Sequence, residues 1–126
     1  MIFLMALARI PIRIEIEGLG ELDGELIRFY APLTVSTFVK MLPIGGAIAK
    51  WDYAIYFQVP LERGAEKPVS RVSAGDILYW PPGSCIALAF ADAAPPAQMI
   101  KIGRYQADYE RIKLVRVGAR ITIRKV

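Results

Sequence analysis

The first pattern along this chain is a strict alternation of apolar and polar positions near its start. Isoleucine occupies positions 10, 12, 14 and 16, and proline, arginine or glutamate fills the positions between them. Because successive side chains of a β-strand point to opposite faces, this period predicts a half-buried strand. A similar alternation at 119–126 and at 53–59 predicts two more strands. The Asp23-Gly24 pair favours a tight hairpin turn, with its return strand at 26–30.

Residues 75–90 (GDILYWPPGSCIALAF) hold two apolar runs that meet at a proline-proline-glycine corner. Pro82 and Gly83 suit the two central positions of a type II turn, so the sequence predicts a strand, a rigid turn and a second strand. From Cys85 to Phe90 every position is apolar, which is typical of a strand whose two faces are both covered. We therefore expect this hairpin to lie within a closed or covered sheet.

Helical spacing is confined to two short stretches. Apolar residues at 35, 38, 39 and 42 follow Pro32 and predict a helix of about ten residues that ends near Pro43. Asp108 is placed to cap a second short helix, which Gly118 ends. With about eight strands and two short helices, the sequence predicts a mainly β domain, a closed and mainly antiparallel barrel.

Length and composition favour one domain over the whole of residues 1–126, with a hydrophobic fraction of 55% that supports a large core. The first eight residues are all apolar, which is too few for a membrane-spanning helix, and the first charge is Arg9. We expect 1–9 to be an extra N-terminal strand or a flexible lead, and a subunit contact there would make a homo-oligomer. Cys85 is the only cysteine, which excludes an intrachain disulfide and suits a cytoplasmic location.

The chain contains no histidine, so histidine-based acid–base catalysis, the common catalytic triads and most zinc sites are excluded. No glycine-rich phosphate loop is present either, and we expect neither a metal nor a cofactor. From residue 100 onward, eight basic residues face two acidic ones, a net charge of +6. This C-terminal third could attract nucleic acid, although a solvated barrel surface explains the same charges.

Three segments resemble a family of small prokaryotic proteins of uncharacterised function with a cyclophilin-like fold. The Gly75–Gly83 hairpin (GDILYWPPG) carries the most specific motif, and Trp51–Pro60 (WDYAIYFQVP) is similar to the preceding family strand. Ile102–Arg104, with the helix after Asp108 and the last strand, is similar to the closing part of cyclophilins. The resemblance implies an eight-stranded barrel with a helix at each open end.

The resemblance does not imply prolyl isomerase activity, because the residues that active cyclophilins use are not matched. Those enzymes use an arginine and a phenylalanine from one strand and a tryptophan or histidine from a later loop. Here the strand Ile55–Pro60 has no basic residue, Arg63 lies in the following loop, and 92–98 has no aromatic residue. We therefore predict that the chain is not an enzyme, with a degenerate isomerase that uses Arg63 as the alternative.

The candidate binding residues are those that could line a groove on the outside of the barrel. Tyr56 and Gln58 share one face of their strand, and we place Trp80 and Phe90 with them, with Arg63 as a further candidate. Such a groove suits a peptide or a small apolar ligand, so we predict a non-catalytic binding module. The same aromatic side chains could instead pack under a loop. Nucleic-acid binding through the basic C-terminal third is the second alternative.

Overall fold

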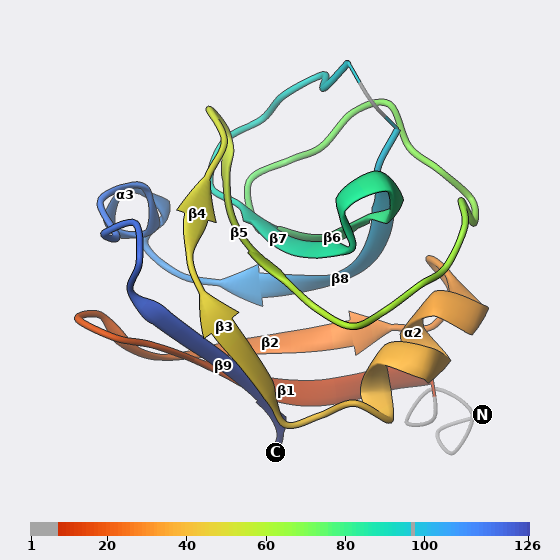
Figure 1. The fold of residues 1–126 in the computed structure, drawn as a ribbon, viewed down its shortest axis with the longest axis horizontal. Helices are drawn as coiled ribbons and strands as arrows, with labels where there is room; N and C mark the ends of the chain where they lie inside the picture. Colours follow the sequence, from red (N-terminus) through yellow and green to blue (C-terminus); the bar gives the residue numbers. More distant parts are fainter. Residues whose placement is uncertain (1–7, 97) are drawn as a thin grey trace.

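The alternating segments of the chain pair into one antiparallel sheet that curls into a barrel (Figure 1). The computed structural model describes residues 8–96 and 98–126. Its strands are β1 (Arg9–Ile16), β2 (Gly20–Ile27), β3 (Ile44–Ala47), β4 (Ala49–Lys50), β5 (Ala54–Gln58), β6 (Asp76–Trp80), β7 (Cys85–Ala89), β8 (Ile100–Gln106) and β9 (Arg120–Lys125). The other elements are the α-helices α2 (Pro32–Val39) and α3 (Tyr109–Lys113) and the 3-10 turn η1 (Pro81–Gly83). The strand order is β3-β9-β1-β2-β8-β6-β7-β5-β4.

The barrel closes through one short segment of the chain, residues 44–50. Its first half, β3, pairs with β9, and its second half, β4, pairs with β5 at the other end of the strand order. Ile48 lies between the two halves and is buried, with only 2% of its surface exposed. Because β3 and β4 are two halves of one segment, the nine strands confirm the predicted eight-stranded barrel.

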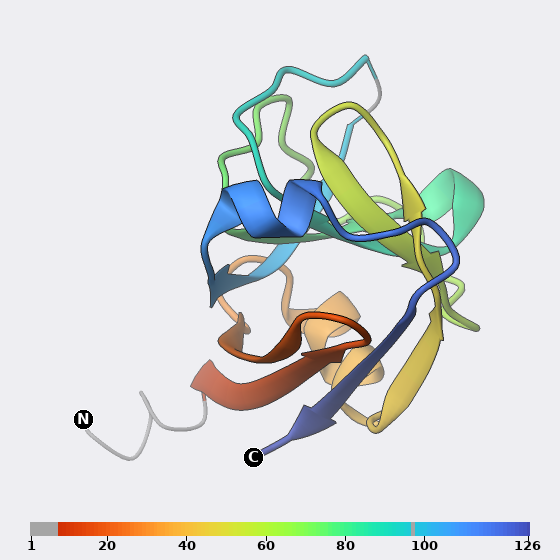
Figure 2. The same cartoon turned by 90° about the vertical axis from the view of Figure 1, so that its left-hand side faces the viewer.

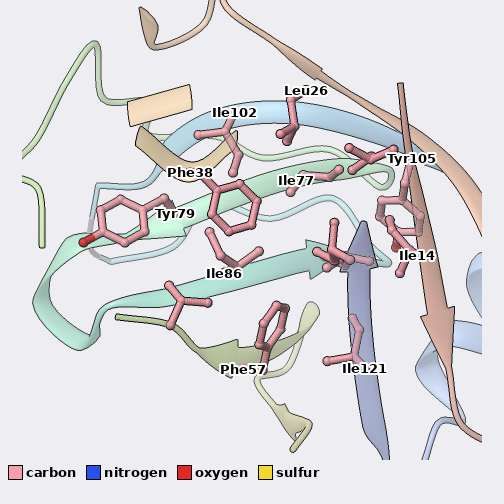
Figure 3. Close-up of a cluster of buried hydrophobic side chains, with 14 of the residues drawn as sticks. Ile14, Leu26, Phe38, Phe57, Ile77, Tyr79, Ile86, Ile102, Tyr105 and Ile121 are labelled. Atoms are coloured by element: carbon pink, nitrogen blue, oxygen red, sulfur yellow. The ribbon is translucent and has the colours of Figure 1, made fainter. Parts of the chain in front are cut away.

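One cluster of large apolar side chains, here called the inner core, fills the inside of the barrel (Figure 3). Its members labelled in Figure 3 are Ile14, Leu26, Phe38, Phe57, Ile77, Tyr79, Ile86, Ile102, Tyr105 and Ile121. Phe38 enters this core from α2 and Ile112 from α3, and the two helices lie at opposite ends of the barrel in Figure 1. The prediction of one helix at each end is therefore confirmed.

Two fully buried tyrosines bring hydroxyl groups into the inner core, and each hydroxyl has a partner. The Tyr79 hydroxyl donates to the Leu61 carbonyl at 2.6 Å and accepts a hydrogen bond from the Arg63 amide at 3.3 Å. The Tyr105 hydroxyl donates to the Ala89 carbonyl at 2.6 Å, and burial raises the pKa of this phenol. An unpaired buried hydroxyl would cost about 1–3 kcal/mol, so these bonds let aromatic bulk fill the barrel without that penalty.

β7 is buried on both faces, as its unbroken apolar sequence predicts. Ile86 and Leu88 belong to the inner core, whereas Ala87 and Ala89 belong to a second apolar cluster outside the barrel, here called the outer cluster. Residues of two loops cover this outer face, and antiparallel bridges join the loops, one between Val69 and Met99 and one between Val72 and Ala93. The outward residues of β7 are small, so the covering segments can lie close to the sheet.

The predicted hairpin turn at Asp23-Gly24 is wrong. Both residues lie inside β2, which pairs with β1 along its whole length, and the turn is made by residues 17–19. Gly18 has φ of 84°, and the Leu19 amide donates to the Ile16 carbonyl at 3.0 Å. A left-handed residue is needed only where the chain reverses, and Gly18 supplies it at the end of the isoleucine alternation.

The predicted type II turn after Trp80 is also replaced by another conformation. Residues Pro81–Gly83 form the 3-10 turn η1, and the left-handed residue is Ser84, with φ of 50°. Two consecutive prolines hold φ near the value that a 3-10 turn needs, which shifts the reversal one residue later. Gly83 is required for a different reason, since a Cβ there would overlap the ring of Trp80.

The N-terminus of α2 is capped from a distant loop. Its N-cap residue, Ala31, has no side chain that can accept a hydrogen bond. Instead the Glu66 carboxylate accepts hydrogen bonds from the Leu33 and Thr34 amides, at 3.0 and 2.8 Å, and from the Thr34 hydroxyl at 2.8 Å. Partial burial acts to raise the pKa of Glu66, but these hydrogen bonds outweigh it and lower that pKa below its ordinary value of 4.5. The charged 61–68 loop is therefore attached to the helix.

We expect Gly45→Ala to destabilise the barrel at its closure. A Cβ at Gly45 would lie 2.5 Å from the Ile121 carbonyl oxygen, which belongs to the backbone of β9 and cannot move without breaking the strand pairing. The free energy of unfolding, measured by urea denaturation, should fall by about 2 kcal/mol. Gly64→Ala is the control because nothing lies within 4 Å of its added Cβ, and a loss as large as that of Gly45→Ala would contradict this account.

We expect Glu66→Gln to lower the free energy of unfolding by about 1 kcal/mol at pH 7, because a neutral amide caps a helix less well than a carboxylate. The pKa of Glu66 is lower in the folded state, so its contribution is complete at neutral pH. This stabilisation by Glu66 is lost as the pH falls below about 4.5 and then through the lower pKa that Glu66 has in the folded protein. The difference between wild type and variant should therefore shrink in denaturation curves recorded at falling pH. Glu62→Gln, in the same loop, is the control and should leave the free energy of unfolding at pH 7 unchanged, because the helix amides donate to Glu66.

Candidate functional site

Four aromatic side chains from three segments meet on the outside of the barrel. Trp51, which follows β4, stacks on Tyr56 of β5 with ring centroids 4.2 Å apart and an angle of 19° between the planes. Trp80, at the end of β6, meets Trp51 edge to face, with centroids 5.5 Å apart and an angle of 83°. The ring centroid of Tyr53 lies 5.8 Å from that of Trp51. Trp51 is therefore the centre of this aromatic group.

A surface pocket of about 390 Å³, here called the aromatic pocket, opens beside these rings. Its lining residues are Lys50, Trp51, Asp52, Tyr53, Trp80, Pro95, Pro96 and Met99. The walls are mostly aromatic rings, proline rings and a thioether, and the charged side chains come only from residues 50 and 52. Small-ligand sites typically combine such apolar walls with a few polar groups, and they occupy roughly 300–1,000 Å³.

The local sequence holds Trp80 rigidly in place. It lies between β6 and the 3-10 turn, whose two prolines restrict the backbone. Gly83 lets the chain pass close to the Trp80 ring, where any larger residue would collide with it. Cys85 pairs with Trp80 across the hairpin, is buried, and directs its thiol to the Gly83 carbonyl at 3.2 Å. Burial raises the pKa of this thiol, as expected of a structural cysteine.

The structure brings three of the five predicted site residues onto one outer surface. Tyr56 and Trp80 belong to the aromatic group, although only Trp80 lines the pocket. Gln58 is exposed and pairs with Cys85 of β7, and Cys85 pairs with Trp80 on its other side. Gln58, Cys85 and Trp80 therefore form one row across the sheet. Phe90 lies elsewhere, because it packs against the inner core.

Arg63 is also separate from the aromatic pocket. Its amide donates to the hydroxyl of Tyr79, and its charge helps to lower the pKa of Glu66 near the start of α2. It is not among the residues that line the pocket. The sequence had suggested Arg63 as a substitute for a missing catalytic arginine, and the structure places it with the helix cap.

Several residues of the pocket were not predicted from the sequence, namely Trp51, Tyr53 and Met99 with the two prolines at 95 and 96. Trp51 carried a signal, since it opens the segment that resembles the family strand. Met99 and the prolines come from the segment that covers β7, and their position depends on the bridge between Val69 and Met99. Pairing between distant loops leaves no local pattern in a sequence.

A group of charges around the buried Asp76 lies on the same side of the sheet as the aromatic group, but its ion pairs link β6 to β8. Asp76 is 2% exposed, and its carboxylate accepts hydrogen bonds from Arg104 at 2.6 Å and from the Ser73 amide at 2.8 Å. The Lys101 ammonium is 3.2 Å from the same carboxylate and 4.5 Å from the centre of the Tyr30 ring. These groups satisfy one another, as buried charges must.

The chemistry available in the aromatic pocket is limited. Lys50 is the only basic residue in its lining, and its ammonium donates to the Lys113 carbonyl at 2.6 Å. Within residues 8–96 and 98–126, no group of three histidine, cysteine, aspartate or glutamate side chains could hold a metal ion. In the same residues, no helix is both long and apolar enough to span a bilayer. The arrangement is suited to contact with an apolar ligand.

Comparison with known proteins gives a matching family and several similar solved structures, one of which is described here. The family model described as cyclophilin-like matches residues 10–124. The solution structure of a hypothetical protein from Archaeoglobus fulgidus is 30% identical in sequence and superposes with a TM-score of 0.73. That alignment covers 94% of this chain and 96% of the archaeal one. None of the curated proteins compared with the chain matches it.

The family match and the barrel describe the same part of the chain. Residues 10–124 run from β1 to β9 and so include both helices, the closing segment and the Trp80 hairpin. The archaeal relative matches over nearly its whole length, so the likeness is that of an entire domain. On this evidence the chain belongs to the cyclophilin-like family.

Proposed function

We propose that this protein is a non-catalytic binding module that receives a short apolar, proline-containing peptide segment in the aromatic pocket. The observation that supports the proposal is the pocket itself, with two tryptophans and a tyrosine in its wall. Proline-rich segments dock in grooves lined by aromatic side chains, because the extended proline helix loses little entropy on binding. A small molecule with the same apolar, flat shape would fit the same site.

The alternative of prolyl isomerisation is weakly supported by the pocket. Rotation about an amide has a barrier of about 18–20 kcal/mol, and a catalyst must offer charge stabilisation that strengthens as the amide twists. Arg63 lies outside the pocket lining, and the ammonium of Lys50 is engaged by the Lys113 carbonyl. We therefore propose binding without catalysis.

Nucleic-acid binding through the basic C-terminal third is also less well supported. Single-stranded nucleic acids bind where basic residues accompany aromatic rings that can stack on the bases. Lys101 and Arg104 are paired with Asp76, and Arg124 is paired with Glu21 at 3.1 Å. The aromatic pocket contains none of the basic residues of this third. A cytoplasmic location remains part of our proposal, since the single cysteine is a buried thiol.

The proposal is tested by tryptophan fluorescence, because the chain has two tryptophans and both line the pocket. We expect the peptide acetyl-Ala-Pro-Ala-Pro-Ala-amide to change this fluorescence saturably, with a Kd on the order of 0.1–1 mM for so small a ligand. Tyr53→Ala keeps both reporters and should weaken binding about fivefold or more, since it removes one aromatic wall.

Phe29→Ala is the matched control for Tyr53→Ala. Phe29 is 64% exposed and is not part of the pocket, so its removal should leave the Kd unchanged. Exchange NMR on the same mixture should show no acceleration of cis/trans interconversion in the peptide. Accelerated exchange would favour the isomerase, and equal Kd values for wild type and Tyr53→Ala would contradict the proposed site.

A further inference from the structure

A second hollow, of about 770 Å³, lies at the end of the barrel that α3 covers, and here it is called the α3 hollow. It is formed between the turn of the β1 and β2 hairpin and the segment that follows α3. Figure 2 shows this side of the molecule, with α3 above the tip of the hairpin. The α3 hollow shares no lining residue with the aromatic pocket.

The walls of the α3 hollow expose apolar side chains that the fold does not use. Leu114 is 77% exposed and Val117 is 67% exposed, two of the five large apolar side chains that stand out in the described part of the chain. Both line the hollow, and Leu19 contributes a third apolar side chain from the hairpin turn. Large apolar groups gathered in a concave surface are typical of a binding site, whereas single exposed ones are ordinary.

Two arginines accompany these apolar groups. Arg111 and Arg116 both line the hollow, both are exposed, and neither forms an ion pair within residues 8–96 and 98–126. Arg111 and Leu114 are three residues apart on α3 and its C-cap, so they lie on one side of the helix. The one acidic residue of the lining is Glu17, whose carboxylate accepts a hydrogen bond from the Arg120 amide at 3.1 Å.

The framework of the hollow is tied together by backbone hydrogen bonds. The Glu17 amide donates to the Arg120 carbonyl at 2.9 Å, and the Gly118 amide donates to the Ile48 carbonyl at 2.8 Å. The hairpin turn and the segment after α3 are therefore fixed to the closing part of the barrel. A preformed site of this kind does not spend binding energy on ordering its own backbone.

We propose that the α3 hollow binds a small amphipathic carboxylate, a medium-length aliphatic chain that ends in a carboxylate group. Arginine binds carboxylates bidentately, and the exposed leucine and valine would cover the aliphatic chain. The volume of the hollow is that of a site for one small molecule. Nucleic acid fits less well, because no aromatic side chain in the lining can stack on a base.

The test is a two-dimensional NMR titration of the labelled protein with octanoate, kept below the concentration at which it forms micelles. We expect saturable shifts of the Gly18 and Gly118 amides, which belong to the lining. Acetate lacks the chain and 1-octanol lacks the charge, so each should bind at least about tenfold more weakly, which corresponds to about 1.4 kcal/mol. Equal binding of octanoate and 1-octanol would overturn the proposal.

Variants locate the site. The double change Arg111→Gln with Arg116→Gln should weaken octanoate binding about tenfold, and Leu114→Ser should also weaken it. Arg71→Gln is the matched control, since Arg71 is exposed and outside the hollow, and it should leave binding unchanged. Undiminished octanoate binding in the double variant would overturn the proposal. So would salt-sensitive binding to anionic vesicles or to oligo(dT) without saturable octanoate shifts.

Discussion

Closure of the sheet by residues 44–50 is the constraint on which the rest of the structure depends. One segment must pair with β9 in its first half and with β5 in its second, so the two ends of the strand order meet within seven residues. This requires a close approach at Gly45, where no Cβ fits beside the Ile121 carbonyl. Closure removes the sheet edges, which would otherwise expose unpaired backbone groups, and it separates an inner face from an outer one.

A closed barrel leaves the outer face of β7 to be covered by loops, and the shape of the candidate binding surface follows from how they cover it. Large inward and small outward residues alternate along β7, so the covering loops can pack directly on the sheet through Val69, Val72, Ala93 and Met99. The aromatic pocket lies between the covering loop and the Trp51 segment, so its walls come from parts far apart in the sequence.

The predictions from sequence succeeded where the pattern is set by one strand or one helix. Isoleucine alternation located β1, the unbroken apolar run predicted the burial of β7, and Asp108 does cap α3 through its bond to the Glu110 amide. They failed at turns. Asp23-Gly24 has the composition of a hairpin turn, but it lies within β2, which pairs with β1 on one side and with β8 on the other. Trp80 and Tyr56 were found because they lie on strands, whereas Met99 is positioned by a bridge between loops.

The placement of positive charge is the physical basis of our proposal that this barrel binds a ligand without catalysis. Catalysis on an amide needs a cation and an apolar cradle at the same point. Here Arg104 and Lys101 neutralise the buried Asp76, and Lys50 is engaged by a backbone carbonyl. Arg111 and Arg116 line the α3 hollow, and neither forms an ion pair within the described residues. The α3 hollow shares no lining residue with the aromatic pocket. Aromatic surface and available charge are thus divided between two hollows, and this division is the reason that we propose binding without catalysis.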